Sequence, residues 1–579
     1  MEVKLEYEKY KKIRDNYSDK VSRFANIRMF LFLVILFSFI VKYYYYPFLF
    51  QVVFIVSLVL FIIMVFIHDK YFKVYDYYVK YVEVLENYLA RKDGKWKSFE
   101  DNGDEFLDDK KSYLSDLDIL GSCSLFQYLN VCKTLGGREC LVSRLSNLQI
   151  VEDEWKSNQE AIIELAKKVS FAVNFQVAMK YYEKKNIHLE KEFSYLDKGI
   201  GKKKFDLIIG IIAGIICIVL FLLGGFKVIS FSYFYGMFFF NLLISYLYAL
   251  IFKEEFISLD KTVLTYGKLQ EEFLVFEKEK FQSVGLKQIQ KRMLKGMKDI
   301  IILRRIDSMN SLRNNLLANL ICNGLGCFNL FLLYYYSEFL NHNLEHLKIS
   351  IRDIEEMEAM VSLATLGIVR EDYCIPEYTE KVSLSFREIK HPLLDEKVCV
   401  GNDFDAKAGV NIITGSNMGG KTSFLRMIGI NLILMQAGGF VCAESFSASY
   451  FKLFTSMRIA DNIEKRISTF YGELLRIQDM VLYVNDGNML VLIDEIFKGT
   501  NYQDRMYGAR EVIRKLNTRN TIAFITTHDF ELCEENNIHN YHVKEDYEGD
   551  KIIFDYKIRT GKVKSTNAKY LMKKLGIID

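Results

Sequence analysis

The sequence has little proline and little net charge. Only three prolines occur in 579 residues, at Pro47, Pro376 and Pro392, and the formal net charge is +3 at pH 7. Because proline interrupts helices, this scarcity favours long helices through most of the chain. The small net charge gives no sign of a nucleic-acid binder that depends on bulk charge, so any DNA contact would have to be a local patch.

The chain also lacks a Cys-x-x-Cys pair. Its ten cysteines are scattered, and the two closest are Cys322 and Cys327. This pattern disfavours a cysteine-ligated metal site, and it indicates a reduced, cytosolic setting rather than a disulfide scaffold.

Length and composition indicate several structural units in different surroundings. A chain of 579 residues exceeds what one hydrophobic core organises, so we expect about two to four units. Hydrophobic residues make up 50% and charged residues 26%, a mixture that fits neither a purely soluble enzyme nor a polytopic transporter. The apolar excess must therefore be local.

Four apolar runs hold this excess, and each approaches the ~20 residues of a membrane-spanning helix. They are Met29 to Tyr46, Phe48 to Ile67, Leu207 to Phe226 and Val228 to Phe252. They form two hairpins whose turns, "KYYYYP" and "GGFK", carry little charge, whereas lysine and arginine gather on the outer flanks. By the positive-inside rule both hairpins enter the membrane from the cytoplasm and return to it, which leaves both termini cytoplasmic. The alternative is two pairs of buried core helices.

A phosphate-binding motif follows a short apolar segment. The stretch "NIITGSNMGGKTSFLRM" (residues 411–427) fits G-x-x-x-x-G-K-[ST] and lies between a strand-like and a helix-like segment. In this motif backbone N–H groups surround the phosphates of ATP, the lysine reaches the β- and γ-phosphates, and the next hydroxyl ligates Mg²⁺. Lys421 and Thr422 hold these two positions. The predicted nucleotide-binding residues are Gly415, Ser416, Asn417, Met418, Gly419, Gly420, Lys421, Thr422 and Ser423.

Two later segments complete the predicted site. "MLVLIDE" (Met489 to Glu495) is typical of a buried parallel strand that ends in two carboxylates. Asp494 would hold Mg²⁺ through water, and Glu495 would polarise the attacking water as a general base. The strand-like "TIAFITTHD" delivers His528, whose imidazole would contact the γ-phosphate. Alternatively, the carboxylates are surface groups and the histidine is structural.

These motifs resemble those of the MutS-type ATPases of DNA mismatch repair, whose nucleotide domain is of the ABC class. "RISTFYGEL" resembles the family's signature segment, "LIDEIFKGTN" its acidic strand and "TTHDFEL" its histidine switch. Four more segments resemble parts of the family. The entry strand is resembled by "KHPLL", and the last lever helix by "EEMEAMVSLA". The opening of the lever is resembled by "SLFQYLNVCKTLGGRECLVSRLSNL", and the closing strand and helix by "YKIRTGKVKSTNAKYLMKKLGI". The resemblance covers residues 116–200 and 320–579.

The resemblance implies an ATP-dependent homodimer with two composite sites. In it Ser468 reaches across the dimer to the γ-phosphate bound by the opposite subunit, and Gln436 lies in the loop that links nucleotide state to helical arms. An ordinary helix N-cap is a second reading of Ser468.

The sequence also departs from the family. The first apolar hairpin occupies the place of the mismatch-reading domain, and Cys399 stands where many relatives place an aromatic ring beside the adenine. Mismatch-specific binding is therefore not expected, whereas DNA binding itself stays open.

The expected fold is an α/β P-loop (ABC-class) ATPase domain at the C-terminus, preceded by a mainly α-helical lever region that carries two transmembrane helical hairpins. The expected segments are a cytoplasmic N-terminal segment (1–28), a transmembrane hairpin (29–67), a cytoplasmic helical linker (68–115), a first lever part (116–206), a second transmembrane hairpin (207–252), a second lever part (253–375) and the ATPase domain (376–579).

The predicted function is a multi-pass, membrane-anchored ATPase with its N-terminus and ATPase domain in the cytoplasm. It uses ATP and Mg²⁺, and its expected partners are a second copy of the chain, the lipid bilayer and, left open, DNA. The rivals are an ABC-type transporter and an ATP-gated tether between DNA and membrane. A transporter is disfavoured because only four spans are present and because "RISTFYGE" replaces a Leu-Ser-Gly-Gly-Gln signature.

A fifth apolar run, Leu316 to Tyr336, is interrupted by three asparagines and two glycines. A fifth crossing would place the phosphate loop outside the cell, where it would find no ATP. We therefore expect this run to form a buried helix.

Overall fold

The computed structural model describes residues 2–41, 47–108, 110–146, 151–183, 204–266, 269–416, 419–458, 469–498, 500–548 and 551–562. Asn417, Met418 and Ser468 lie outside these residues. The chain divides into two compact units. Unit 1 comprises Met1–Asn130, Leu141–Val177 and Val361–Asp579, and unit 2 comprises Val131–Cys140 and Ala178–Met360.

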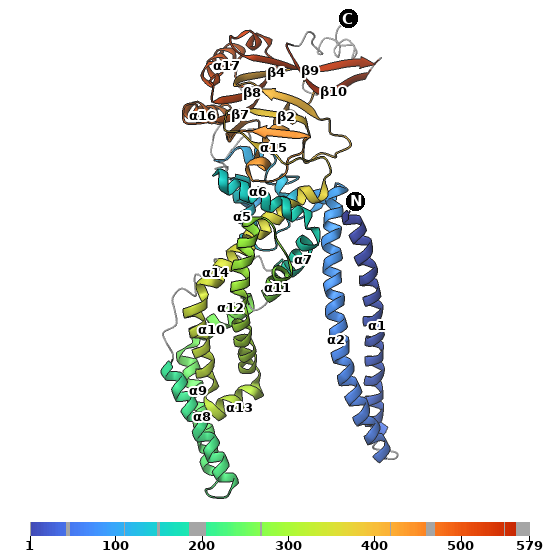
Figure 1. Cartoon of the computed structure of the whole chain (residues 1–579), viewed down its shortest axis with the longest axis vertical. Coiled ribbons are helices and arrows are strands. Elements are labelled where there is room, and N and C mark those ends of the chain that lie inside the picture. Colours follow the sequence, from blue (N-terminus) through green and yellow to red (C-terminus); the bar gives the residue numbers. More distant parts are fainter. Residues whose placement is uncertain are drawn as a thin grey trace. The chain divides into compact units, whose positions relative to one another are not determined.

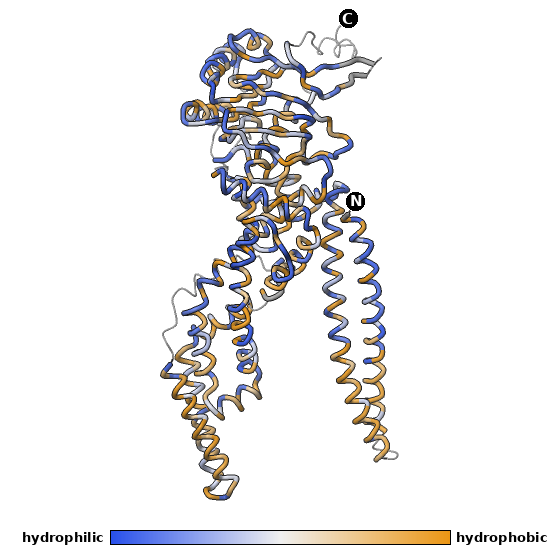
Figure 2. The backbone as a smooth tube through the Cα atoms, viewed as in Figure 1, coloured by the Kyte–Doolittle hydropathy of each residue, from blue (hydrophilic) through white to orange (hydrophobic). Residues whose placement is uncertain are grey.

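Unit 1 begins with an antiparallel pair of long helices, α1 (Glu2–Val41) and α2 (Pro47–Lys92), of 40 and 46 residues (Figure 1). Their apolar runs occupy the halves next to the turn, whereas the other halves are largely polar (Figure 2). There the helices pack through tyrosine rings, such as Tyr10 and Tyr81, whose centroids lie 4.2 Å apart. The residues on both sides of position 28 belong to one helix, α1.

Short helices follow α2, and most of their residues belong to unit 1. Two 3₁₀ turns, η1 (Lys95–Ser98) and η2 (Asp104–Phe106), lead to the small helix α3 (Tyr113–Asp116). The next helices are α4 (Leu125–Leu129), α5 (Leu135–Ser146), α6 (Glu152–Lys167) and α7 (Val169–Met179).

Two sheets form the C-terminal part of unit 1 (Figure 1). The six-stranded sheet has the order β10-β9-β4-β8-β7-β6; β10 is antiparallel to β9, and the other neighbours are parallel. Its strands are β4 (Gly409–Thr414), β6 (Lys452–Ser456), β7 (Met489–Asp494), β8 (Thr521–Thr527), β9 (His539–Glu548) and β10 (Lys551–Thr560). The second sheet has the order β1-β5-β2-β3. Its strands are β1 (Glu377–Tyr378), β2 (Leu384–Ile389), β3 (Asn402–Ala406) and β5 (Ser445–Ala448).

Helices cover the six-stranded sheet. All residues of β4 and β8 are buried, as expected for parallel strands that are covered on both faces. Helices α16 (Thr469–Tyr483) and α17 (Tyr502–Leu516) contribute Met480 and Met506 to one hydrophobic core with Val491 and Ile525 of the sheet. Three strands predicted from the sequence are confirmed: β4 before the phosphate loop, β7 before the two carboxylates and β8 before His528.

Unit 2 is helical. Its main helices are α8 (Lys204–Gly225), α9 (Ser232–Ile251), α10 (Lys253–Tyr266), α11 (Gln270–Lys278), α12 (Val284–Asn314), α13 (Leu316–Gly326) and α14 (Phe328–Val369), of which the last nine residues belong to unit 1. The expectation of long helices from the scarcity of proline is confirmed by α12 and α14, of 31 and 42 residues.

Four helices in the described part of the chain are long and apolar enough to cross a membrane: α1, α2, α8 and α9. The most apolar stretches of α1 and α2 are 6% buried, and those of α8 and α9 are 22% and 17% buried. Most of their apolar side chains therefore face outward, so these helices are not core helices of this chain.

The fifth apolar run differs from the expected single buried helix. It is divided into α13 and the start of α14, whose axes differ by 93°. The break lies at Cys327, whose φ of 52° is in the left-handed region. One face of α13 is exposed, with Leu316 at 82% and Leu317 at 70%. The prediction of a single buried helix was wrong because the chain bends sharply at Cys327, between Gly326 and Phe328.

Candidate nucleotide-binding site

The predicted site residues follow three neighbouring parallel strands, β4, β8 and β7. Thr414 at the end of β4 pairs with Thr527 of β8, and Asp494 at the end of β7 pairs with Thr526 of β8. The carboxyl ends of the three strands therefore share one edge of the sheet. The phosphate loop, His528 and the two carboxylates all begin at this edge.

Close packing requires glycine in the phosphate loop. Gly415 has a φ of 140°, and a Cβ there would lie 2.3 Å from Cγ2 of Val543 on β9. A Cβ at Gly419 would lie 2.6 Å from the same atom. Gly420, with a φ of 84°, precedes the first turn of α15 (Lys421–Gln436). The loop thus brings the backbone N–H groups of a helix N-terminus to the sheet edge, a setting that suits an anion.

Lys421 is held by the loop that precedes it. Its Nζ donates to the carbonyl oxygens of Gly415 (2.6 Å) and Ser416 (3.0 Å). Only 3% of the residue is exposed, and burial lowers the pKa of Lys421 to about 8. Ser416 Oγ is buried and has no hydrogen-bond partner among the described residues. A cation, an unpaired hydroxyl and helix N–H groups form a donor set that fits phosphate oxygens.

Thr422 and Asp494 form the expected pair for Mg²⁺. Thr422 Oγ1 donates to Asp494 Oδ2 at 2.8 Å, and Thr526 Oγ1 donates to Asp494 Oδ1 at 2.6 Å. The side chain of Asp494 is 10% exposed. A hydroxyl and a carboxylate are the oxygen ligands that Mg²⁺ prefers, so these two residues fit the ion. Ser423, by contrast, is exposed on the first turn of α15.

Glu495 lies beside the two basic groups of the site. Its Oε1 lies 3.2 Å from His528 Nε2, which also lies 3.2 Å from Lys421 Nζ. The hydrogen bond to His528 and the nearby charge of Lys498 lower the pKa of Glu495 to about 2, although burial opposes this. The same Nε2 can donate to Glu495 or accept from Lys421, but not both at once. The tautomer of His528 therefore decides whether its Nε2 pairs with Glu495 or with Lys421.

The backbone around Glu495 is held in an uncommon conformation. Glu495 and Phe497 both have φ near 59°, a region that non-glycine residues occupy mainly at turns and functional sites. The N–H of Glu495 donates to Thr526 Oγ1 at 3.1 Å, and that of Phe497 donates to the buried Glu473 at 2.5 Å. These contacts hold the backbone of Glu495 and of the turn that follows it.

Sequence reasoning missed several supporting residues. Thr526 Oγ1 donates to Asp494 and accepts from the N–H of Glu495. Lys498 lies 3.7 Å from Glu495, and Glu473 accepts from the N–H of Phe497. The signal for Thr526 was a hydroxyl pair directly before the histidine in "TTHD". Gln436 is the last residue of α15 rather than part of a loop, and its Oε1 accepts from the N–H of Phe451 at 3.0 Å.

Another missed residue, Asp116, lies far from the site motifs in the sequence. Asp116 is fully buried and accepts hydrogen bonds from Thr455 Oγ1 (2.7 Å) and the N–H of Met457 (3.1 Å) and Arg458 (3.1 Å). It also pairs with Arg476 of α16 at 3.0 Å. Asp116 thus ties the end of β6 and α16 to the segment before α4.

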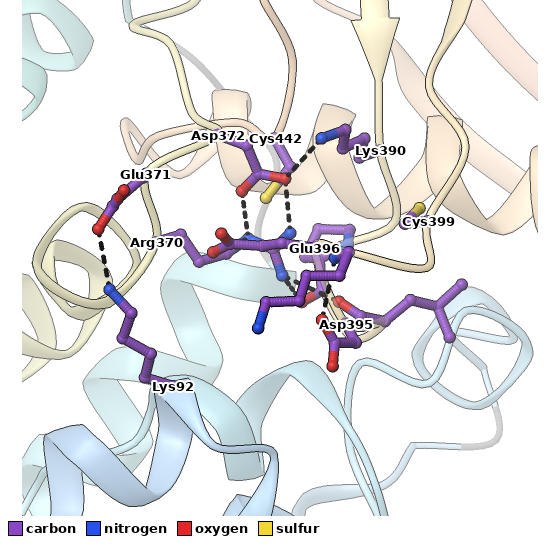
Figure 3. A network of polar contacts seen from close by, with 12 residues as sticks. Lys92, Arg370, Glu371, Asp372, Lys390, Asp395, Glu396, Cys399 and Cys442 are labelled. Atoms are coloured by element: carbon purple, nitrogen blue, oxygen red, sulfur yellow. Dashed lines mark hydrogen bonds and ion pairs between the residues drawn. The ribbon is translucent and has the colours of Figure 1, made fainter.

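Figure 3 shows the polar network around the loop that contains Cys399. The buried Arg370, just after α14, donates to both oxygens of Asp372 (2.8 Å each) and to the carbonyl oxygens of Pro392 (3.0 Å) and Leu394 (3.1 Å). Burial raises the pKa of Asp372, but the guanidinium outweighs it, so the pKa is lowered overall. Cys399 Sγ accepts from the N–H of His391 at 3.2 Å, so the thiol is engaged inside its own loop.

The structure therefore brings five predicted residues together, namely Lys421, Thr422, Asp494, Glu495 and His528. The predictions for Asn417, Met418 and Ser468 fall outside the described residues.

Residues 411–574 match MutS domain V. MutS domain V is an ABC-class ATPase, so the chain carries an ATPase domain of this class after a helical N-terminal region. ATPases of this family are typically dimeric.

Curated relatives share the C-terminal part. The chain is 30% identical over 253 residues to the "Endonuclease MutS2" of Carboxydothermus hydrogenoformans. It is 29% identical over 244 residues to a "DNA mismatch repair protein MutS" of Leptospira interrogans, and 30% identical over 237 residues to one of Listeria monocytogenes. The matches cover 42%, 39% and 39% of this chain and 32%, 28% and 27% of the relatives. The chain thus spans about a third of the length of these relatives.

Proposed function

We propose that this protein is a membrane-anchored, MutS-like ATPase that acts as a homodimer. The observation that carries this proposal is the meeting of Lys421, Thr422, Asp494, Glu495 and His528 at one edge of the MutS domain V sheet. These groups supply phosphate binding, Mg²⁺ binding and a base within hydrogen-bonding reach of one another.

The chain's own groups have distinct roles in hydrolysis. The N-terminus of α15, Ser416 and Lys421 bind the phosphates, and Glu495 accepts a proton as water attacks the γ-phosphorus in line with the leaving ADP oxygen. Mg²⁺, held by Thr422 and Asp494, would neutralise charge on the phosphate oxygens when bound. His528 stabilises the charge that develops on the γ-phosphate.

Before nucleotide binds, Glu495 is paired with His528. A carboxylate with a pKa of about 2 is a weak base, and its partner His528 is the group expected to contact the γ-phosphate. Bound nucleotide would draw His528 and Lys421 toward phosphate oxygens, which raises the proton affinity of Glu495. The pairing thus favours hydrolysis only when the γ-phosphate is present.

The membrane assignment rests on α1, α2, α8 and α9. Their apolar faces are exposed, and lysine and arginine flank the outer ends of both hairpins. Membrane-impermeant thiol labelling of cysteines placed at residue 579 and in the 42–46 turn tests the topology. We expect labelling of intact cells at the turn only; labelling at residue 579 would contradict a cytoplasmic ATPase domain.

The homodimer is tested by mixing two defective chains. If Ser468 acts on the opposite subunit, Ser468→Arg and Lys421→Ala homodimers are each nearly inactive. A mixed dimer has one site with both defects and one with neither, so co-expression restores part of the ATP hydrolysis. A dimeric Ser468→Arg protein with full activity would exclude the composite site.

We propose that the helical arms bind DNA without mismatch specificity. Two of the three relatives above are described as DNA mismatch repair proteins, but this chain matches only 28% and 27% of their length. The test compares ATP hydrolysis with heteroduplex, branched and plain duplex DNA at two salt concentrations, because phosphate contacts weaken with salt. An unchanged rate of ATP hydrolysis with all three DNAs would indicate that the arms bind a protein or a lipid instead.

A further inference from the structure

The break between α13 and α14 packs against the middle of the α8–α9 hairpin. The backbones of Gly326 and Gly214 approach closely, because a Cβ at Gly326 would lie 3.4 Å from Cα of Gly214 on α8. Gly214 is ten residues after the first residue of α8, Lys204, which is roughly 15 Å along the helix axis. A Cβ at Gly324 would meet the ring of Phe238 on α9 at 2.3 Å. Cys327 Sγ also donates to the carbonyl oxygen of Asn241, the tenth of the 20 residues of α9. The break therefore lies about halfway along both proposed membrane-spanning helices.

The chain approaches this point from the level at which α9 ends. α10 begins at Lys253, directly after α9. At the end of α12, Arg313 pairs with Asp260 of α10 at 3.2 Å and lies over the ring of Phe256 at 4.5 Å. Asn310 donates to the same Asp260 at 2.7 Å. The chain thus leaves α12 beside the first turns of α10.

The chain also returns to this level. One turn after the break, the ring of Phe331 lies against Gly210 of α8, nearer the start of α8 than Gly214. Tyr336 then forms hydrogen bonds with Ser258 (2.9 Å) and Thr262 (2.8 Å) of α10. Residues 316–336 therefore run from α10 to the middle of the hairpin and back, which is the path of a re-entrant segment and not of a fifth crossing.

Side chains satisfy the backbone groups that the break releases. The carbonyl oxygen of Gly324 accepts from Asn241 Nδ2 at 3.0 Å, and the N–H of Asn329 donates to Asn323 Oδ1 at 3.0 Å. Ser245 Oγ of α9 donates to the same Asn323 oxygen. In water such groups could bond to solvent, whereas irregular backbone at membrane depth is tolerated only when the protein satisfies it. At this elbow, the break between α13 and α14, the carbonyl of Gly324 and the N–H of Asn329 are thus paired as a lipid setting requires. The side-chain oxygens Oδ1 of Asn241 and Asn329 are buried without a partner among the described residues.

The opposite face of α13 is apolar and exposed. Its outward residues, with their exposed fractions, are Leu316 (82%), Leu317 (70%), Leu320 (47%), Ile321 (51%) and Leu325 (41%). Helices α8 and α9, which pack against the break, also expose apolar side chains, such as Ile215 (57%) and Leu243 (55%). The 11 residues of α13 extend about 16 Å, which is too short to cross a bilayer.

We propose that α13 is a re-entrant membrane helix whose leucine face contacts lipid acyl chains. It enters the leaflet next to the basic Lys204 and Lys253 ends of α8 and α9 and gives unit 2 a third membrane contact. This proposal rests on the proposed membrane anchorage. Because α14 is continuous from Phe328 to Val369, lipid contact at the elbow fixes the membrane end of that helix.

Tryptophan fluorescence in vesicles tests the proposal. The full-length protein is reconstituted in phosphatidylcholine and phosphatidylglycerol, with or without phosphatidylcholine brominated on its acyl chains, which quenches nearby indoles. The native Trp96 and Trp155 are 3% and 6% exposed, and the wild-type signal is subtracted. We expect Leu320→Trp to lose most of its added emission to bromine, as strongly as Leu243→Trp on α9. Leu264→Trp, on a 65% exposed position of α10, should be unaffected.

The outcomes separate this proposal from the membrane anchorage. Quenching of Leu243→Trp without quenching of Leu320→Trp overturns the re-entrant helix and leaves the anchorage standing. Absence of quenching at both positions overturns the anchorage itself. Blue-shifted emission of Leu320→Trp without quenching would show that protein, such as a second copy, covers this face. If Leu320→Trp does not fold, Leu317→Trp on the same face serves as the second probe, with the same two readings.

Discussion

The nucleotide site and the α13 elbow both bury polar groups, but the groups are of different kinds. The site contains groups in reach of water or of an opposite charge: the side chains of Glu495 and His528 are 29% and 42% exposed, whereas Lys421, at 3% exposed, lies near the charges of Glu495 and Asp494. The elbow contains neutral groups that are almost fully buried, with Asn323 at 2% and Ser245 at 1%. A charge needs water or a counter-charge, whereas a neutral amide can complete a broken helix without either. Phosphate chemistry requires the first arrangement, and a lipid setting requires the second.

The largest effect is expected for the charged site. Glu495→Gln removes the base but keeps the shape of the side chain, so hydrolysis should slow by ~10²–10⁴ while ATP binding persists. Single-turnover hydrolysis and nucleotide binding of the detergent-solubilised protein measure the two effects. The matched control is Glu531→Gln, an exposed carboxylate in the same domain, which should hydrolyse normally. An unchanged rate in Glu495→Gln would mean that the charge at this position serves structure alone.

The next effect concerns a buried charge outside the site. Asp116→Ala removes four hydrogen-bond and ion-pair partners at a fully buried position, and it should destabilise unit 1 by roughly 3–5 kcal/mol. Hydrogen exchange of the β6 and β7 amides measures this loss. Asp76→Ala, which removes an exposed pair with Lys80, should cost about 0.5 kcal/mol or less. Equal effects of the two substitutions would show that burial of Asp116 does not set its contribution.

A pH-dependent loss of stability is expected from His391. Burial, together with Arg426 and Arg370, lowers the pKa of His391 to about 4. The unfolded chain takes up a proton near pH 6.5 and the folded chain does not, so stability is lost as pH falls from 6.5 to 4, by roughly 3 kcal/mol. His391→Gln should reduce this slope in hydrogen exchange of the β2 amides. His342→Gln, at an exposed position of α14, should leave the slope as it is.

The smallest effect is expected at the elbow. Ser245→Ala removes a neutral hydrogen bond to Asn323, and bonds of this kind between helices in membranes contribute about 0.6 kcal/mol on average. Thermal unfolding of unit 2 in detergent measures the change, and Ser232→Ala at the exposed start of α9 is the control. A loss as large as that of Asp116→Ala would break the contrast between the charged and the neutral region.

The sequence predicted the strands that carry the candidate nucleotide site because their signals are local. A phosphate loop requires glycines at fixed spacing, and buried parallel strands require continuous apolar runs, so β4, β7 and β8 were recognisable with Lys421 and Asp494 at their ends. The helices were predicted for the same reason, because apolar runs and the scarcity of proline act along the chain.

Tertiary structure alone decided contacts between distant segments. No local pattern places Asp116 against β6 and α16, more than 300 residues later in the chain. Likewise, the asparagines of residues 316–336 look like defects in an apolar helix until α8 and α9 are placed beside them. Hydrogen bonds and close backbone packing depend on which groups meet in space. Sequence periodicity records only which face of each element is apolar.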